Sequence, residues 1–257
     1  MITKPISFDD VLLVPQYSDI TSRKDVSITS SLQRVGEFSL PIISSPMDTV
    51  TETKMALTMR DHGGLGIIHR YNTVEEQMDL VHSTHAEGAL VAAAIGVSGD
   101  FEQRACALYD VGANVLCIDV AHGHHILVKN ALKRLREIFG EEIHIMAGNV
   151  ATLEGFNDLA DWGADSIRVG IGGGSICSTR LVTGHGVSTL QSIIECSTSD
   201  RDARLIADGG MKTSGDIVKA LAAGADFAIL GSMLAGTDES PGQIFDSGSK
   251  KYKVYRG

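Results

Sequence analysis

Short apolar runs rich in β-branched residues alternate with amphipathic helical stretches from residue 40 onward. This alternation is typical of parallel strands joined by helical crossovers, because a parallel neighbour can be reached only by a long connection. Several predicted helices end in a Gly-Ala step, such as Gly112-Ala113, where a left-handed cap turns the chain into the next strand. We expect strands at residues 40–44, 65–68, 90–95, 115–120, 144–148, 166–170, 204–207 and 227–230.

Eight strand–helix units are the number that closes a TIM (β/α)8 barrel, whereas a doubly wound open sheet normally has fewer strands and a switch point. With 257 residues, of which 43% are hydrophobic, the chain can build one such core. The sequence therefore predicts an α/β fold with a single TIM-barrel domain over residues 1–257. We expect helices at residues 52–62, 74–80, 101–111, 126–139, 153–162, 188–196 and 214–223.

Only residues 231–257 follow the last predicted strand. We therefore expect the barrel to lack its final outer helix, and residues 246–257 read as a turn followed by a strand-like segment. Either the chain is a fragment, or something else covers the flank of the first and last strands.

The net charge of −10 argues against a surface that binds nucleic acid or an anionic membrane. No apolar run reaches transmembrane length, and residues 1–5 lack the apolar core of a signal peptide. The cysteines at 106, 117, 177 and 196 form no C-x-x-C pair, so neither a zinc site nor a disulfide framework is predicted. We expect a protein of the reducing cytoplasm, with Cys106, Cys117 and Cys196 serving only in packing.

In a TIM barrel the active site is built by the loops that follow the strands. Residues 170–179 run from the sixth predicted strand into a glycine-dense loop that carries Cys177. Taken alone, such a loop is more often a plain turn, and a free cysteine is more often a small buried hydrophobe. The position of this loop after a strand in the strand–helix alternation favours a role in ligand binding and catalysis. Glycines let backbone groups approach a ligand, and the cysteine adds a nucleophile. We therefore expect covalent chemistry at Cys177, with Thr179 positioning a water or an amine.

Two further loops carry glycines where TIM barrels typically bind phosphate: Asp208-Gly209-Gly210 after the seventh strand and Leu230-Gly231-Ser232 after the eighth. Glycine amides can reach phosphate oxygens directly. Asp208 would be repelled by phosphate, so its better role is to bond ribose hydroxyls. The loops together predict a nucleoside monophosphate as ligand.

These loops and segments near both ends of the chain resemble the catalytic barrel of the IMP dehydrogenase/GMP reductase family. The resemblance covers almost the whole sequence, and the matching segments taken together are highly specific. They are residues 7–13 (SFDDVLL), 44–52 (SSPMDTVTE), 119–124 (DVAHGH), 147–150 (AGNV), 170–179 (GIGGGSICST), 207–210 (ADGG) and 255–257 (YRG).

The resemblance implies that Cys177 attacks C2 of a purine nucleotide while a hydride passes to or from NAD or NADP. It also implies that Thr179 helps to activate water or ammonia, and that a homo-tetramer forms. The residues it assigns to the nucleotide are Ser45, Met47, Ser175, Asp208, Gly210, Gly231, Ser232 and Tyr255. It assigns Asp119, Asn149 and Gly170 to the nicotinamide cofactor, and the carbonyls of Gly172, Gly174 and Cys177 to a monovalent cation such as K⁺.

The sequence departs from the family pattern in three places. Gly173 stands where many members have proline or serine, which should loosen the loop. Val187-Ser188-Thr189 replaces the usual Val-Pro-Gln, so the loop after Cys177 is expected to close differently. The sequence ends at Gly257, before the mobile flap and final helix that the resemblance implies, and the flap supplies groups needed for turnover.

The dehydrogenase and the reductase reactions share the covalent step, so only differences in short sequence segments can separate the two. Residues 49–52, 119–124 and 255–257 look more like IMP dehydrogenases, and Arg70 stands where many reductases have lysine. The regulatory modules that most dehydrogenases insert between strands 2 and 3 are missing, as they are in compact reductases. We favour IMP dehydrogenase, with GMP reductase as the alternative and a non-catalytic nucleotide-binding or subunit-interaction barrel as the third reading.

Overall fold

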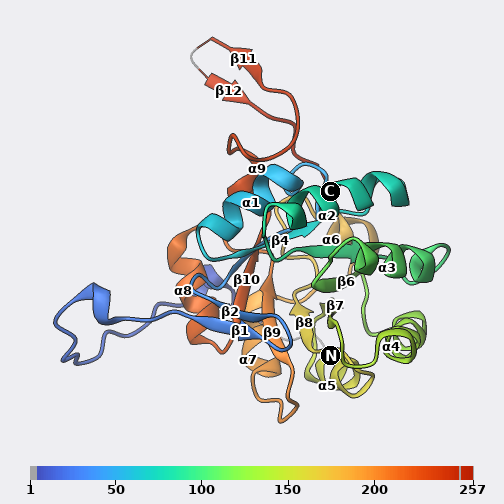
Figure 1. The fold of residues 1–257 in the computed structure, drawn as a ribbon. Helices are drawn as coiled ribbons and strands as arrows, with labels where there is room; N and C mark the ends of the chain where they lie inside the picture. Colours follow the sequence, from blue (N-terminus) through green and yellow to red (C-terminus); the bar gives the residue numbers. More distant parts are fainter. Residues whose placement is uncertain (1–4, 249, 257) are drawn as a thin grey trace.

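The computed structural model describes residues 5–248 and 250–256, and its centre is a closed barrel of parallel strands (Figure 1). The ring closes where β10 pairs with β3, with Ala228 opposite Ile42. The TIM-barrel prediction is confirmed, and all eight predicted strands form. They are β3 (Ile42–Ser44), β4 (Leu65–Ile68), β5 (Ala92–Ile95), β6 (Val115–Asp119), β7 (His144–Val150), β8 (Ser166–Val169), β9 (Arg204–Asp208) and β10 (Phe227–Leu230).

Helices form the outer layer of the barrel, one after each of the first seven strands (Figure 1). They are α1 (Thr53–Asp61), α2 (Val74–Ala86), α3 (Phe101–Asp110), α4 (Ile126–Phe139), α5 (Leu153–Asp161), α7 (Thr189–Cys196) and α8 (Ser214–Ala222). Two shorter helices belong to loops, α6 (Thr179–Thr183) and α9 (Ser232–Ala235). Within the described residues, β10 is followed only by α9 and the hairpin of β11 (Phe245–Ser247) and β12 (Lys250–Tyr252).

Helix α2 runs six residues further than the apolar pattern predicts. Its start is fixed by a capping box, in which the Thr73 side chain accepts from the Glu76 N–H and the Glu76 carboxylate accepts from the Thr73 N–H. Its last turn is polar, so it carries no hydrophobic period. The helix continues there because Val81 is fully buried and the Thr84 hydroxyl donates to the Leu80 carbonyl.

A hairpin that the sequence analysis did not predict closes the amino end of the barrel. It consists of β1 (Ser30–Leu32) and β2 (Gly36–Phe38), and its side chains Leu32 and Phe38 are almost completely buried. The Phe38 ring packs edge-on against Phe227 of β10, with ring centroids 5.7 Å apart. The hairpin therefore completes the inner core, which the barrel strands alone would leave open to water.

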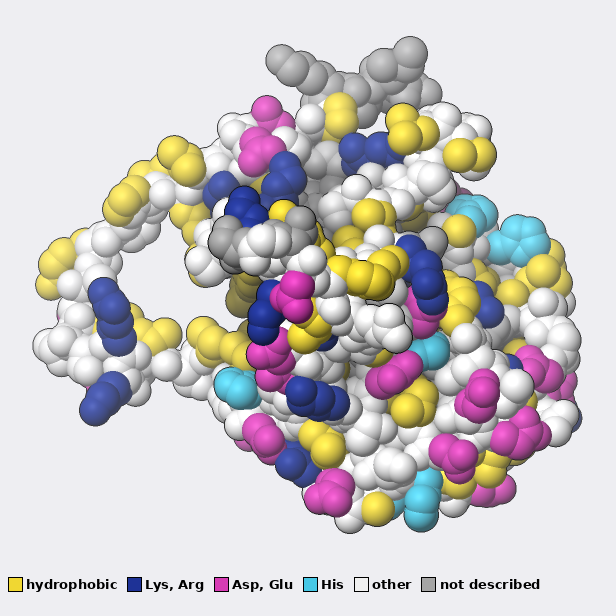
Figure 2. Space-filling view, turned by 90° about the horizontal axis from the view of Figure 1, so that it is seen from above, with side chains coloured by type: hydrophobic (Ala, Val, Ile, Leu, Met, Phe, Trp, Pro, Cys, Tyr) yellow, Lys and Arg dark blue, Asp and Glu magenta, His cyan; other side chains and the backbone are white. Residues whose placement is uncertain are grey.

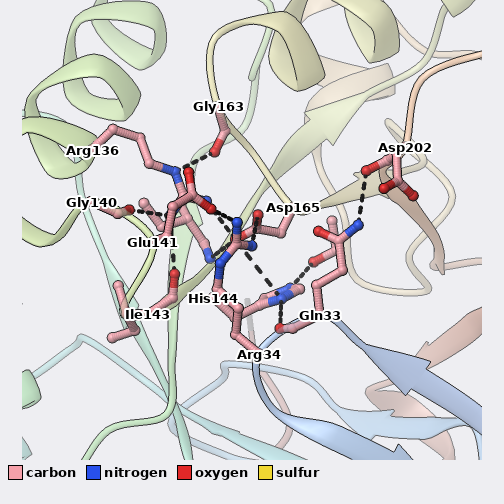
Figure 3. A network of polar contacts seen from close by, with 12 residues as sticks. Gln33, Arg34, Arg136, Gly140, Glu141, Ile143, His144, Gly163, Asp165 and Asp202 are labelled. Carbon is pink, nitrogen blue, oxygen red and sulfur yellow. Dashed lines mark hydrogen bonds and ion pairs between the residues drawn. The ribbon is translucent and has the colours of Figure 1, made fainter.

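A network of hydrogen bonds and ion pairs connects this hairpin to the amino end of the barrel (Figure 3). Asp165, just before β8, accepts from Arg136 Nη2 at 2.5 Å and from the Ile145 N–H at 2.7 Å. It also pairs with Arg34 of the hairpin turn, which in turn pairs with Glu141. Because Asp165 is buried and all these donors converge on it, losing one guanidinium would leave a poorly compensated charge.

His144 lies inside the same network (Figure 3). Its Nδ1 is 2.8 Å from the Gln33 carbonyl and its Nε2 is 2.8 Å from Ser166 Oγ. A carbonyl can only accept, so Nδ1 carries the proton and Nε2 accepts from the Ser166 hydroxyl. Burial lowers the pKa of His144 to about 4, although nearby Asp165 partly opposes the shift. The ring is therefore neutral at pH 7.

Residues 11–29 leave the body of the molecule as an extended arm, drawn in blue at the left of Figure 1. Apart from the short 3-10 helix η2 (Arg23–Asp25), the arm has no regular structure. Several of its apolar side chains are exposed, among them Leu12 (86%), Val14 (76%) and Tyr17 (95%). Apolar side chains line the same projecting arm in the view from above (Figure 2). No helix among the described residues is long and apolar enough to cross a membrane.

Candidate active site

A cleft of about 470 Å³ opens at the carboxyl ends of the barrel strands. This size lies in the range of small-molecule sites. The structure brings every residue that the sequence analysis selected to this one cleft. They are Ser45, Met47, Asp119, Asn149, Gly170, Gly172, Gly174, Ser175, Cys177, Thr179, Asp208, Gly210, Gly231, Ser232 and Tyr255.

Cys177 is the exposed cysteine of the chain. It lies on the loop between β8 and α6, where its N–H donates to the Gly174 carbonyl at 3.2 Å. Its Sγ is 3.3 Å from Oγ1 of Thr179, the first residue of α6. The thiol and the hydroxyl can therefore act on the same ligand atom.

The other cysteines pack as predicted. Cys117 and Cys196 are buried and Cys106 is half-buried. Burial raises the pKa of Cys117 and of Cys196 to about 12, so neither forms a thiolate near neutral pH. Cys177 is therefore the accessible thiol at the cleft.

The cysteine loop approaches the end of β9 so closely that its first residue has to be glycine. Gly170 has a φ of +144°, and a Cβ there would lie 2.0 Å from the carbonyl oxygen of Asp208. Any side chain would push the loop away from β9. This contact sets the position of the segment that carries Cys177 relative to Asp208.

Arg168 is the functional residue that the sequence analysis missed. It lies on β8 and is 5% exposed, and its side chain spans two carboxylates of the cleft. Nη1 is 2.6 Å from Asp119, while Nε and Nη2 are 3.0 and 2.7 Å from Asp208. Burial opposes the charge, but Asp208 and Asp119 outweigh it and hold the pKa of Arg168 well above its ordinary value. A charged residue inside a predicted buried strand was the available signal.

Asn149, which follows β7's Gly148, extends this arrangement across the cleft. Its amide nitrogen donates to the Gly170 carbonyl at 2.8 Å and to Asp208 at 2.9 Å. Asp208 thus accepts hydrogen bonds from Arg168 and from Asn149 on the same oxygen, Oδ2. Its other oxygen, Oδ1, has room to accept from the hydroxyls of a sugar.

The far end of the cleft is formed by small polar groups. Ser45, Gly231 and Ser232 line it, and Tyr255 covers it. The Tyr255 hydroxyl lies 4.0 Å from the Met47 sulfur and would be 3.0 Å from a Cβ at position 231. Burial raises the pKa of Tyr255, so its hydroxyl keeps its proton and can donate to an anion.

Arg70 and Tyr71 line the opposite end, beside Asp119. Arg70 Nη2 donates to the Asp119 carbonyl at 3.1 Å, and its guanidinium carbon lies 5.7 Å from the centre of the Tyr71 ring. The Nε of Arg70 is buried and has no partner among the described residues. An unpaired donor beside an exposed aromatic ring fits an aromatic ligand that carries hydrogen-bond acceptors.

Comparison with known proteins agrees with this geometry. The family model "IMP dehydrogenase / GMP reductase domain" matches residues 5–257. Inosine-5'-monophosphate dehydrogenase of Nitrosopumilus maritimus (strain SCM1) is 32% identical over 98% of this chain and 79% of its own length. GMP reductase of Leishmania major is 32% identical over 98% of this chain and 79% of its own length. Inosine-5'-monophosphate dehydrogenase of Staphylococcus aureus (strain MW2) is 34% identical over 98% of this chain and 78% of its own length.

The alignments with these relatives extend over 378 to 388 positions, more than the 257 residues of this chain. The relatives therefore contain segments that have no counterpart in this chain. In the structure, β4 leads directly into α2 and then β5, as the sequence analysis expected. The matched family model and the identity to both kinds of enzyme show that the chain belongs to the IMP dehydrogenase/GMP reductase family of NAD(P)-dependent purine-nucleotide oxidoreductases.

Proposed function

We propose that this chain is an IMP dehydrogenase, which oxidises IMP to XMP with NAD. The observation that carries the proposal is the exposed Cys177 thiol, 3.3 Å from Thr179, in a cleft lined by the residues expected to hold a nucleotide. Four sets of groups divide the work: the nucleophile, the ribose and phosphate ligands, the cofactor ligands and a shell of backbone carbonyls for a cation.

Cys177 supplies the covalent step. Its sulfur bonds to C2 of the purine as the thiol proton leaves, and C2 then loses a hydride. Water, polarised by the Thr179 hydroxyl, next adds to C2. The carbon–sulfur bond breaks, which releases XMP and restores the thiol. The balance is IMP, NAD⁺ and water giving XMP, NADH and a proton.

The nucleotide is held at both ends of its sugar. Asp208, oriented by Arg168, accepts from the ribose hydroxyls. The phosphate lies against Ser175, Gly210, Gly231 and Ser232, with Ser45 and Met47 beside it and the protonated Tyr255 hydroxyl donating. This division keeps the Asp208 carboxylate away from the phosphate, as charge repulsion requires.

The nicotinamide cofactor fits the end of the cleft that holds Asp119, Asn149, Gly170 and the unpaired Arg70 Nε. When bound, it supplies the acceptor for the hydride that leaves C2. Asp119 is held in place by Arg168, and the Asn149 amide is fixed by Gly170 and Asp208. These polar groups therefore need little reordering when the cofactor binds.

A potassium ion is proposed at the backbone carbonyls of Gly172, Gly174 and Cys177. The Gly174 carbonyl already accepts one N–H, from Cys177, and keeps a second lone pair. Carbonyl oxygens are the donors that such cations prefer. The ion would hold the cysteine loop closed around the thiol.

One feature favours the dehydrogenase over the reductase. GMP reduction expels ammonia, so a proton has to reach the leaving amine. The cationic side chain at the cofactor end is Arg70, and a guanidinium does not release its proton near neutral pH. GMP reductase stays the second candidate, because the Leishmania enzyme is as similar as one of the dehydrogenases.

We also propose a cytoplasmic homo-tetramer. The arm of residues 11–29 exposes Leu12, Val14 and Tyr17, which a partner subunit would cover.

A parallel assay separates the two chemistries. The chain is incubated with IMP and NAD, and separately with GMP and NADPH, while absorbance at the nicotinamide band is followed. A rise in the first mixture supports the dehydrogenase, whereas a fall in the second alone identifies the reductase. Silence in both, with nucleotide still bound in a filter assay, would identify a binding barrel instead.

A further inference from the structure

A second cavity, of about 540 Å³, lies behind the cysteine loop, and we call it the rear pocket. One wall is the amino-terminal segment of residues 5–10, and the other is Arg180 with the loop of residues 184–189. Gly173, Gly210 and Lys212 complete the lining. Gly210 also lines the nucleotide cleft, so the two cavities share a wall of glycine backbone.

Thr189 presents an unsatisfied hydroxyl at this wall. The residue is 4% exposed and lines the rear pocket, yet its Oγ1 has no hydrogen-bond partner among the described residues. Oγ1 lies 2.3 Å from the place that a Cβ of Gly173 would take and 3.5 Å from that of Gly210. Leaving a buried hydroxyl unpaired costs about 1–3 kcal/mol, and a ligand that accepts its proton would remove that penalty.

The amino terminus of α7 opens into the same pocket. Thr189 is the first residue of this helix, and the N-cap residue, Ser188, makes no side-chain capping hydrogen bond. The N-cap hydroxyl, on Ser188, donates instead to the Ile6 carbonyl at 2.6 Å. The free N–H groups and the helix dipole therefore favour an anion at this point.

Arg180 supplies a positive charge beside it. Its guanidinium donates to the Val187 carbonyl at 3.1 Å, and no carboxylate within the described ranges forms an ion pair with it. The other charges of the pocket are engaged: Lys212 pairs with Asp9 at 3.3 Å, and Asp10 accepts from Ser7. Arg180 thus lines the pocket together with the start of α7 as a cation that none of the described carboxylates neutralises in an ion pair.

We propose that the rear pocket binds a phosphate monoester, with its phosphate held by Arg180, the Thr189 hydroxyl and the first N–H groups of α7. Asp9 and Asp10 on the opposite wall would repel a second anionic group. The ligand is therefore a small molecule with one phosphate and neutral hydroxyls beyond it. This site is separate from the nucleotide phosphate site and does not depend on the proposed reaction.

Occupancy of the rear pocket would be felt at the active site. Cβ atoms at Gly172 and Gly186 would lie 2.7 and 2.9 Å from Arg180 Cγ, so the Arg180 side chain packs between the cysteine loop and the loop that follows α6. A phosphate that fixes Arg180 and Thr189 thus also fixes the backbone of residues 172–174, three residues from Cys177. The site is regulatory in the sense that it couples a second ligand to the mobility of the nucleophile.

The test is calorimetric titration of the full chain with inorganic phosphate and with ribose 5-phosphate. We expect R180Q to weaken phosphate binding about tenfold, the loss of one charge-assisted hydrogen bond. T189V should weaken it several-fold and R180K should largely retain it, while S232A in the nucleotide cleft leaves this binding event unchanged. Affinity about tenfold higher for ribose 5-phosphate identifies a metabolite, and equal affinity identifies free phosphate; both support the site.

A second readout covers the case in which a variant unfolds. Iodoacetamide alkylation of Cys177, mapped by mass spectrometry, should slow several-fold in saturating phosphate in the parent chain and in S232A. The slowing should be absent in T189V, which changes the side chain least. The proposal is overturned if phosphate does not bind, if R180Q and T189V bind it like the parent, or if S232A alone removes all binding.

Discussion

Arg168 Nη2 lies 2.7 Å from Asp208 Oδ2, and the same guanidinium reaches Asp119 at 2.6 Å, so a single buried side chain holds two carboxylates of the cleft. The ribose ligand and the cofactor ligand proposed above therefore share one positioning residue. Neither carboxylate can move without disturbing the other. The first prediction follows from this arrangement.

Replacing Arg168 by glutamine should lower the free energy of unfolding by about 3–5 kcal/mol, because two half-buried carboxylates then lose their countercharge. Urea unfolding at pH 7 measures the loss. R168K serves as the matched control that keeps the charge, and it should lose much less stability than R168Q. A loss as large in R168K as in R168Q would contradict the ion-pair account.

His144 should make the fold acid-sensitive. Its folded pKa is about 4, below the unfolded value of about 6.5, so the unfolded chain binds the extra proton. The stabilisation is present above pH 6.5 and is lost as the pH falls towards 4, by about 3 kcal/mol. Urea unfolding across this range should show the slope, and H144Q should flatten it between pH 6.5 and 5, where few carboxylates titrate. An unchanged slope in H144Q would show that another group is responsible.

Gly173 and Thr189 should behave as a coupled pair. A Cβ at Gly173 would meet Thr189 Oγ1 at 2.3 Å, so these two departures from the family pattern pack against each other. We expect G173A to destabilise the chain by about 1–3 kcal/mol and T189A to relieve most of that cost. Thermal unfolding of both single variants and the double variant gives the coupling energy. Additive effects would mean that the two residues do not restrict each other.

The arm should control assembly. Serine at Leu12, Val14 and Tyr17 removes apolar surface that is exposed in the single chain, so it should weaken the proposed tetramer without destabilising the barrel. Sedimentation velocity should show smaller species for the triple variant than for the parent, at an unchanged melting temperature at low concentration. Replacing exposed Val218 of α8 by serine is the matched control. Identical sedimentation of parent and triple variant would remove the arm from the interface.

The barrel could be predicted from the sequence because parallel strands that are buried on both faces read as continuous apolar runs. The runs at residues 65–68 and 227–230 match β4 and β10 to the residue. The β1–β2 hairpin was not predicted from the sequence, because its strands are three residues long and only Leu32 and Phe38 in them are buried. Helix α6 was not predicted either, because it is short. Its residues Leu181 and Val182 face solvent, so the segment has no amphipathic helical pattern.

The cleft residues could be selected because each lies at or just after the carboxyl end of a barrel strand, or belongs to a distinctive segment. Arg168 could not be selected in this way, since it lies in the middle of β8 rather than at the strand's carboxyl end. Its partners Asp119 and Asp208 are 49 and 40 residues away in the sequence. Only the closure of the barrel shows that the three side chains meet.

The most direct test of the central claim is a rapid-mix experiment with IMP and NAD. We predict a burst of NADH close to one equivalent per chain, with one purine nucleotide retained covalently on the peptide that contains Cys177. This step needs only the nucleophile and the cleft described above. C177A should lose the burst by a factor on the order of 10⁴ or more. A burst that survives in C177A, or a nucleotide attached to a different residue, would contradict the account.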